Sequence, residues 1–147
     1  KSKGSYMLSA IAIIVGIITF TIKLNKDSEV AAYRETIAYM DRHNEELDEN
    51  WEKIKLNEGD EKTIKLFLNR LEQMALLVNK RAFDNDLVYS SYWELYSEPL
   101  KNIKVLDFYN HSRSNDQEVY KEYKILSEKW AAKIYTEQNN GANLNNS

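Results

Sequence analysis

The chain has 147 residues, of which 20 are basic and 23 are acidic, giving a formal net charge of −3. It has no cysteine, one proline and four glycines, so disulfides and thiolate metal sites are excluded and few chain breaks are forced. This composition predicts an all-α protein with one small domain and appendages. The two histidines, His43 and His111, have no partner at metal-ligand spacing, so we expect no metal and no cofactor.

The first predicted element is an apolar helix near the N-terminus. Residues 6–22 carry no charge and are flanked by lysines on both sides. Because this length reaches the lower limit of about 17–25 residues for a spanning helix, we expect a transmembrane anchor at 6–24 after a tail at 1–5, with the lipid bilayer as a partner. A cleaved signal peptide or a buried core helix is the alternative. The excess of basic residues after the anchor predicts a single-pass inner (cell) membrane protein with a cytoplasmic helical domain.

The remaining chain is predicted to be an acidic helical domain at 25–137, followed by a disordered tail at 138–147. Acidic residues outnumber basic ones in this domain, whereas binding to nucleic acid requires a basic face, so no nucleic-acid partner is expected. The tail, QNNGANLNNS, has too few apolar residues to order itself. We therefore predict a small antiparallel helical bundle behind the anchor.

The first helix of this domain has apolar positions that alternate three and four apart from Val30 to Ile54, with Asn44 among them. One interpretation is a coiled-coil seam in which a buried Asn44 sets register and oligomeric state. The other is an intramolecular bundle in which the helix stops near His43 and Asn44 caps a second helix. The sequence leaves both open.

The second helix contains the stretch LNRLE, in which Asn69 and Glu72 lie one turn apart beside a broad apolar stripe. The stripe predicts a central helix. Asn69 and Glu72 are candidate site residues, but no third group is visible for acid or base chemistry, so we expect Glu72 to bind a lysine or a backbone donor of a neighbouring helix. A turn and helix cap are predicted around Asp84, the fourth candidate structural polar position beside Asn44, Asn69 and Glu72.

Three further helices are expected. The first begins after the turn at Asp84 and carries an aromatic cluster that is predicted to be core. The second begins at Ser97–Pro99, with the proline in its first turn. The third begins at a capping box of Ser114 with Gln117, or of Asn115 with Glu118, and continues to Ile134.

Several of these segments together are similar to a known family. The N-terminal apolar helix, Thr36–Tyr39, the LNRLE stretch with Ala75 and Asp84, and YKEYKILSEKW at 120–130 resemble a prokaryotic, membrane-anchored helical family, domain of unknown function 4760. The resemblance implies glycines at positions corresponding to Leu77 and near Arg81, where this chain has none. It implies no catalytic residue.

We therefore expect a non-catalytic, membrane-anchored protein-interaction module whose partner is an unknown protein or a second copy of the chain. The chain contains no phosphate loop, zinc signature or catalytic triad, which favours this class. The alternative is a membrane-acting effector of a stress or phage-defence system that oligomerises through its anchor, where Ala12 and Gly16 form a small-residue face. An enzyme using Glu72, Asp84 or Asp86 is the least favoured hypothesis.

Overall fold

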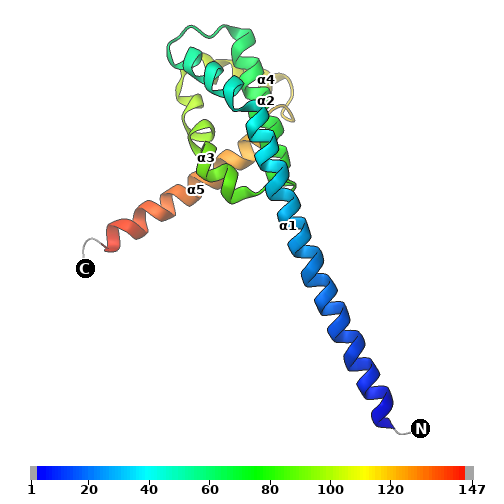
Figure 1. Ribbon diagram of the computed structural model, residues 1–147. Helices are drawn as coiled ribbons and strands as arrows, with labels where there is room; N and C mark the ends of the chain where they lie inside the picture. Colours follow the sequence, from blue (N-terminus) through cyan, green and yellow to red (C-terminus); the bar gives the residue numbers. More distant parts are fainter. Residues whose placement is uncertain (1–2, 145–147) are drawn as a thin grey trace.

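The computed structural model describes the backbone of residues 3–144 and the side chains of residues 14–143. Within that range the chain forms helices and no strand, so the all-α expectation is confirmed (Figure 1). The helices are α1 (Lys3–Lys55), α2 (Glu61–Asn79), α3 (Asn85–Ser97), the 3-10 helix η1 (Pro99–Lys101), α4 (Ile103–Asn115) and α5 (Lys121–Leu144).

The core of the bundle is built around α2, which contacts α1, α3, α4 and α5. Its apolar stripe is completely covered: Phe67, Leu68 and Leu71 have no exposed surface. Aromatic side chains from the other helices close around it, with Tyr96 stacked on Tyr123 at 5.1 Å between ring centroids. The central position predicted for this helix is thereby confirmed.

Local chemistry explains where the helices begin and end. The carboxylate of Asp60 caps α2 by accepting a hydrogen bond from the Thr63 amide at 2.8 Å. The 3-10 turn at Pro99 separates α3 from α4, so the helix expected to start at Ser97–Pro99 begins instead after Asn102, whose side chain caps it. The capping box expected at Ser114 is also wrong, because α4 continues to Asn115 and α5 starts only at Lys121.

Helix α1 is a single unbroken helix, so the interpretation of Asn44 as a helix cap is wrong. The chain needs no break there because one face of α1 buries Tyr39, Leu47 and Ile54 in the bundle on both sides of this position. Asn44 itself is half-buried in the middle of the helix. The apolar seam from Met40 onward therefore packs within one molecule, as in the bundle interpretation.

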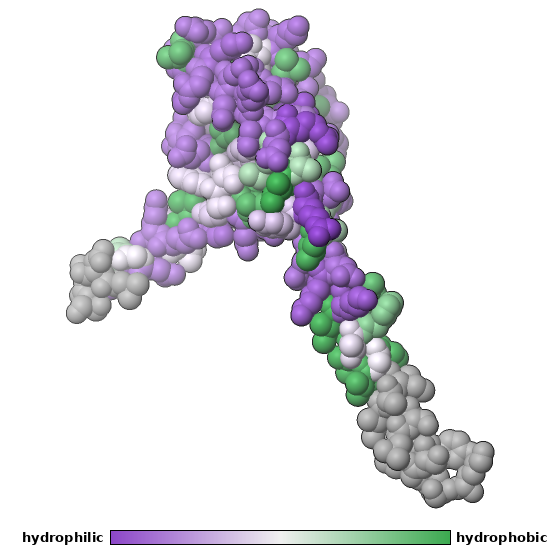
Figure 2. Space-filling model, viewed as in Figure 1, coloured by the Kyte–Doolittle hydropathy of each residue, from purple (hydrophilic) through white to green (hydrophobic). Residues whose placement is uncertain are grey.

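Before Thr36, α1 leaves the bundle and runs away from it as a projecting helix (Figure 1). We name residues 14–35 the α1 arm; all of them except the half-buried Ala32 are exposed. Its apolar side chains form the green region near the projecting end in Figure 2, whereas the visible face of the bundle is largely hydrophilic. The exposed large apolar residues of the arm are Ile14, Val15, Ile17, Ile18, Phe20, Ile22, Leu24, Val30 and Tyr33.

The expected membrane anchor is not supported. Over the residues that the structure describes, no helix is long and apolar enough to cross a membrane. The transmembrane anchor at 6–24, the single-pass topology and the inner-membrane localisation are therefore corrected; the side chains of 1–13 lie outside the described residues.

The C-terminal tail also differs from expectation. Helix α5 continues to Leu144, so the described part of the tail predicted to be disordered is helical. Lys133 lies over the ring of Tyr89 at 3.9 Å, and the Tyr89 hydroxyl donates to Glu137 at 3.2 Å. These contacts hold α5 against α3 up to the start of that tail, and the helix extends from there.

Candidate functional site

Three of the four polar positions singled out in the sequence lie at two places: Asn69 and Glu72 along the contact between α2 and α5, and Asp84 where α1 meets the turn before α3. Asn44 lies on α1, outside both places. Among the side chains that the structure describes, no group of three or more His, Asp and Glu could hold a metal ion. At both places the side chains form hydrogen bonds between different helices or turns.

Glu72 of α2 caps the N-terminus of α5. Its two carboxylate oxygens accept hydrogen bonds from the backbone amides of Glu122 at 3.0 Å and Tyr123 at 2.6 Å. The first amides of a helix have no partner within the helix, and the helix dipole favours a negative charge there. A residue of one helix thus supplies the cap of another that is fifty positions away in the sequence, and Glu72 binds backbone donors rather than a lysine.

Asn69 binds the residue just before α5. The Tyr120 hydroxyl donates a hydrogen bond to the Asn69 side-chain oxygen at 3.0 Å. Tyr120 has a φ of 56°, a left-handed conformation that costs a side-chain-bearing residue roughly 1–2 kcal/mol. Burial, and secondarily the charge of Glu72, raises the pKa of Tyr120 to about 12, so its hydroxyl remains a donor at neutral pH.

About two turns beyond Glu72, at the end of α2, Asn79 also contacts α5. Its side-chain amide donates to both the backbone oxygen and the carboxylate of Glu122, at 3.2 and 2.7 Å. We call Asn69, Glu72 and Asn79 with their partners at 120–123 the α2–α5 seam. Asn79 was not predicted, because a lone asparagine at the end of a helix carries no local signal.

Asp84 lies where α1, the turn after α2 and the start of α3 meet. Its carboxylate caps α3 by accepting from the Leu87 amide at 3.0 Å, and its own amide donates to the Thr36 hydroxyl at 2.8 Å. Thr36 is completely buried, and its hydroxyl donates in turn to the Ala32 backbone oxygen at 2.6 Å. The place where the α1 arm begins is thus fixed to the first turn of α3.

A third polar cluster, between α1 and α2, was not predicted. The Tyr39 hydroxyl and the Arg70 guanidinium both donate to the Gln73 side-chain oxygen at 2.9 Å. His43 lies against Tyr39, with ring centroids 4.4 Å apart. Burial, and then the positive charge of Arg70, lowers the pKa of His43, which keeps the imidazole neutral at physiological pH.

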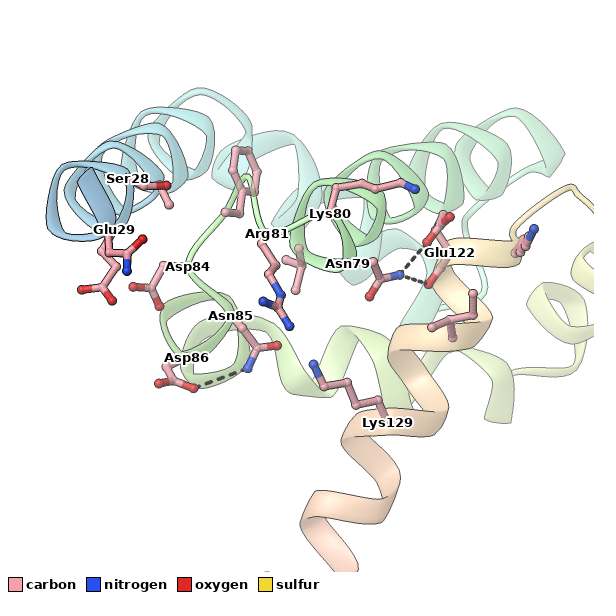
Figure 3. Close-up of a pocket in the computed structure, with 16 residues that line it drawn as sticks. Ser28, Glu29, Asn79, Lys80, Arg81, Asp84, Asn85, Asp86, Glu122 and Lys129 are labelled. Atoms are coloured by element: carbon pink, nitrogen blue, oxygen red, sulfur yellow. Dashed lines mark hydrogen bonds between the residues drawn. The ribbon is translucent and has the colours of Figure 1, made fainter. Parts of the chain in front are cut away.

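A cleft of about 1170 Å³ lies beside the Thr36–Asp84 contact, lined by α1, the turn after α2, the start of α3 and the first turns of α5. Figure 3 shows Glu29 and Asp86 on the wall formed by α1 and α3, and Arg81 and Lys129 on the side of α2 and α5. Asn79 and Glu122 of the α2–α5 seam also line it. The cleft therefore lies between acidic and basic side chains at the root of the α1 arm.

Arg81 stands at a backbone position that favours glycine. Its φ is 60°, and the amides of Arg81 and Ala82 donate to the Val78 and Leu77 oxygens, which is the hydrogen-bond pattern of a Schellman motif after α2. Asn57 occupies the equivalent position after α1, with a φ of 57°. Asparagine tolerates this conformation, whereas arginine adopts it at a cost.

These observations define a class: an all-α bundle whose first helix extends beyond it, with carboxylates used as helix caps. The chain belongs to the family of domain of unknown function DUF4760, whose model matches residues 7–130. The match runs from α1 into α5, and its description assigns no activity. No curated protein and no solved structure matches the chain.

Proposed function

We propose that this protein is a non-catalytic helical interaction module that associates with a second copy of itself through the α1 arm. The observation that carries the proposal is the exposure of nine large apolar side chains along the arm. Contiguous exposed apolar surface of this kind marks interaction sites in folded proteins. Burying one such side chain contributes roughly 1.5–3 kcal/mol, so pairing of a few of them supports a stable dimer.

A second copy fits the arm because the seam of α1 continues into it. Val30, Tyr33 and Ile37 keep the spacing of three and four that Met40 and Leu47 follow within the bundle. The first two are about half exposed, at 49% and 48%, and Ile37 is 37% exposed. In a parallel pair of helices, identical residues of such a seam lie opposite one another. Two copies of this chain would therefore match each other along the seam.

The polar candidates support a non-catalytic role. Both carboxylate oxygens of Glu72 accept backbone amides, and the Asp84 carboxylate accepts the Leu87 amide. Carboxylate oxygens that already accept these backbone amides are occupied in holding the helix ends. These residues therefore act as supports for the helices.

Sedimentation equilibrium of the full chain tests the proposal. We expect a mass above that of the monomer at micromolar concentration, and at least tenfold weaker association for Val30→Lys/Tyr33→Lys, which places two charges on the apolar seam of the arm. The matched control is Leu66→Lys/Leu76→Lys, because these residues are 46% and 39% exposed outside the arm, compared with 49% and 48% for Val30 and Tyr33.

Three outcomes would contradict self-association through the arm. One is a monomer at every concentration. Another is equal weakening by the arm variant and the control variant. The third is a monomeric chain that co-sediments with phosphatidylcholine/phosphatidylglycerol vesicles and loses this property in the arm variant, because the apolar side chains would then serve another contact.

A further inference from the structure

Four cationic residues line the cleft at the root of the α1 arm, and the side chains of two of them, Arg81 and Lys129, approach the same space from different parts of the chain. Figure 3 shows Arg81 extending from the turn after α2 into the cleft, and Lys129 reaching toward the same region from α5. Neither forms an ion pair with another of the described residues. Two like charges directed at one space repel each other unless an anion lies between them.

The backbone at Arg81 makes this arrangement more specific. A left-handed residue after a helix is ordinarily glycine, and this chain places there the side chain with the most hydrogen-bond donors. Unfavourable backbone conformations that persist in a folded protein are concentrated at functional sites. Here the left-handed conformation directs a guanidinium group into the cleft.

The neighbouring side chains restrict the ligand to the basic side of the cleft. Glu122 already accepts from Asn79, and Asp84 already caps α3. Glu29 and Asp86 lie on the opposite wall (Figure 3) and repel an anion from that side. Asn85 is fixed beside Asp86, because its side-chain amide donates to the Asp86 carboxylate at 3.4 Å and its side-chain oxygen accepts from the Trp130 indole at 3.2 Å.

We propose that the α2–α5 side of this cleft binds the phosphate or carboxylate group of a small molecule, with Arg81 and Lys129 as the binding residues. The guanidinium of Arg81 presents paired N–H donors that match the oxygens of such a group, and Lys129 adds a second positive charge. A cleft of about 1170 Å³ is larger than the anionic group alone, so the rest of the ligand occupies the space toward Ser28 and Asn25 of α1. This site is separate from the apolar surface of the arm, so the proposal does not depend on self-association.

The test is a titration of the ¹⁵N-labelled full chain at low salt, with inorganic phosphate and with citrate as separate probes. We expect saturable shifts of the amides of Arg81, Asn85 and Lys129 with at least one probe, and the tighter probe identifies the class of anion. Arg81→Gly is expected to weaken binding at least tenfold and Lys129→Gln at least threefold. Because glycine suits the left-handed backbone, Arg81→Gly should keep or raise the melting temperature, so lost binding cannot be attributed to unfolding.

Two matched controls complete the test. Lys124→Gln removes a positive charge of α5 that is paired with Glu128 and does not line the cleft. Asn57→Gly introduces glycine at the other left-handed helix end, after α1. Both should bind the probes as the unaltered chain does. The proposal is overturned if neither probe gives saturable shifts, or if Lys124→Gln weakens binding as much as Arg81→Gly does.

Discussion

Removing the Glu72 carboxylate should destabilise the bundle through α5 in particular. The carboxylate accepts two backbone amides at the start of that helix, at 3.0 and 2.6 Å. Hydrogen bonds to charged groups contribute roughly 1.5–3 kcal/mol each, and loss of a helix cap costs about 0.5–2 kcal/mol. Since both bonds belong to one half-buried group, we expect Glu72→Ala to lower the free energy of unfolding by about 2–3 kcal/mol.

Glu72→Gln removes the charge of the side chain and nearly keeps its shape, so it measures the contribution of the charge. The amide keeps one oxygen as an acceptor but places an NH2 group against a backbone donor and removes the interaction with the helix dipole, so we expect a loss of about 1–2 kcal/mol. Urea denaturation followed by circular dichroism measures both variants. Hydrogen exchange should accelerate first at the amides of Glu122 and Tyr123.

The control for this series is Glu128→Gln. It removes another carboxylate, one that forms only an exposed pair with Lys124 on α5, and such pairs contribute about 0–1 kcal/mol. The reasoning is refuted if Glu72→Ala loses no more stability than Glu128→Gln, or if exchange at Glu122 and Tyr123 stays unchanged in the Glu72 variants.

The variants Thr36→Val, Tyr120→Phe and Phe67→Ala test a buried hydrogen bond, a raised pKa and the orientation of α2, respectively. Thr36→Val should lower the free energy of unfolding, measured by urea denaturation, by about 1–3 kcal/mol, because the Asp84 amide loses its buried acceptor. Thr36→Ser keeps the hydroxyl and should lower it by at most about 1 kcal/mol. Equal losses in the two variants would contradict this expectation. Since the pKa of Tyr120 is raised to about 12, its contribution to stability is complete below pH 10 and is lost between pH 10 and 12, by no more than roughly 2.7 kcal/mol. Tyr120→Phe should therefore lose less stability than the unaltered chain between pH 10 and 12. If the two proteins lose stability equally over that interval, Tyr120 is not the group responsible. Phe67→Ala should cost about 3–5 kcal/mol, and Leu66→Ala less than about 1 kcal/mol, because Phe67 has no exposed surface and Leu66 is 46% exposed; similar melting temperatures for the two would show that the orientation of α2 is wrong.

The sequence predicted the parts of the fold that depend on local pattern. The stripe of α2 is visible because apolar residues recur at helical spacing, and this spacing alone places Phe67 and Leu71 inside. The cap at Asp84 was expected for the same reason, since an acidic residue before a helical run is a local signal. Glu72 borders the apolar stripe of α2, and a carboxylate at such a border needs a hydrogen-bond partner. This was enough to predict that it binds a donor of a neighbouring helix.

What could not be predicted depends on contacts between distant residues. The start of α5 was placed at a local capping box near Ser114, whereas its cap comes from Glu72. Asn44 has the chemistry of a cap, but packing of Leu47 and Ile54 into the core keeps α1 helical through it. The residues around Arg81 carry no local signal of a left-handed backbone; the one indication was the glycine that the family resemblance implies near this position.

The apolar run near the N-terminus shows the limit of composition. An uncharged stretch was interpreted as a membrane anchor, yet over the described residues no helix meets the length and apolarity needed to cross a bilayer. The same residues instead belong to the projecting part of a helix that is continuous with the bundle. Hydropathy identifies apolar side chains but does not specify what will cover them.

The continuity of α1 has a mechanical consequence. Its 53 residues extend about 80 Å without a hinge, and the buried Thr36 hydroxyl joins this rod to the first turn of α3. The α1 residues that line the cleft, from Asn25 to Ala32, belong to this same rod. A change in the angle between the arm and the bundle would therefore move one wall of the cleft relative to Arg81 and Lys129.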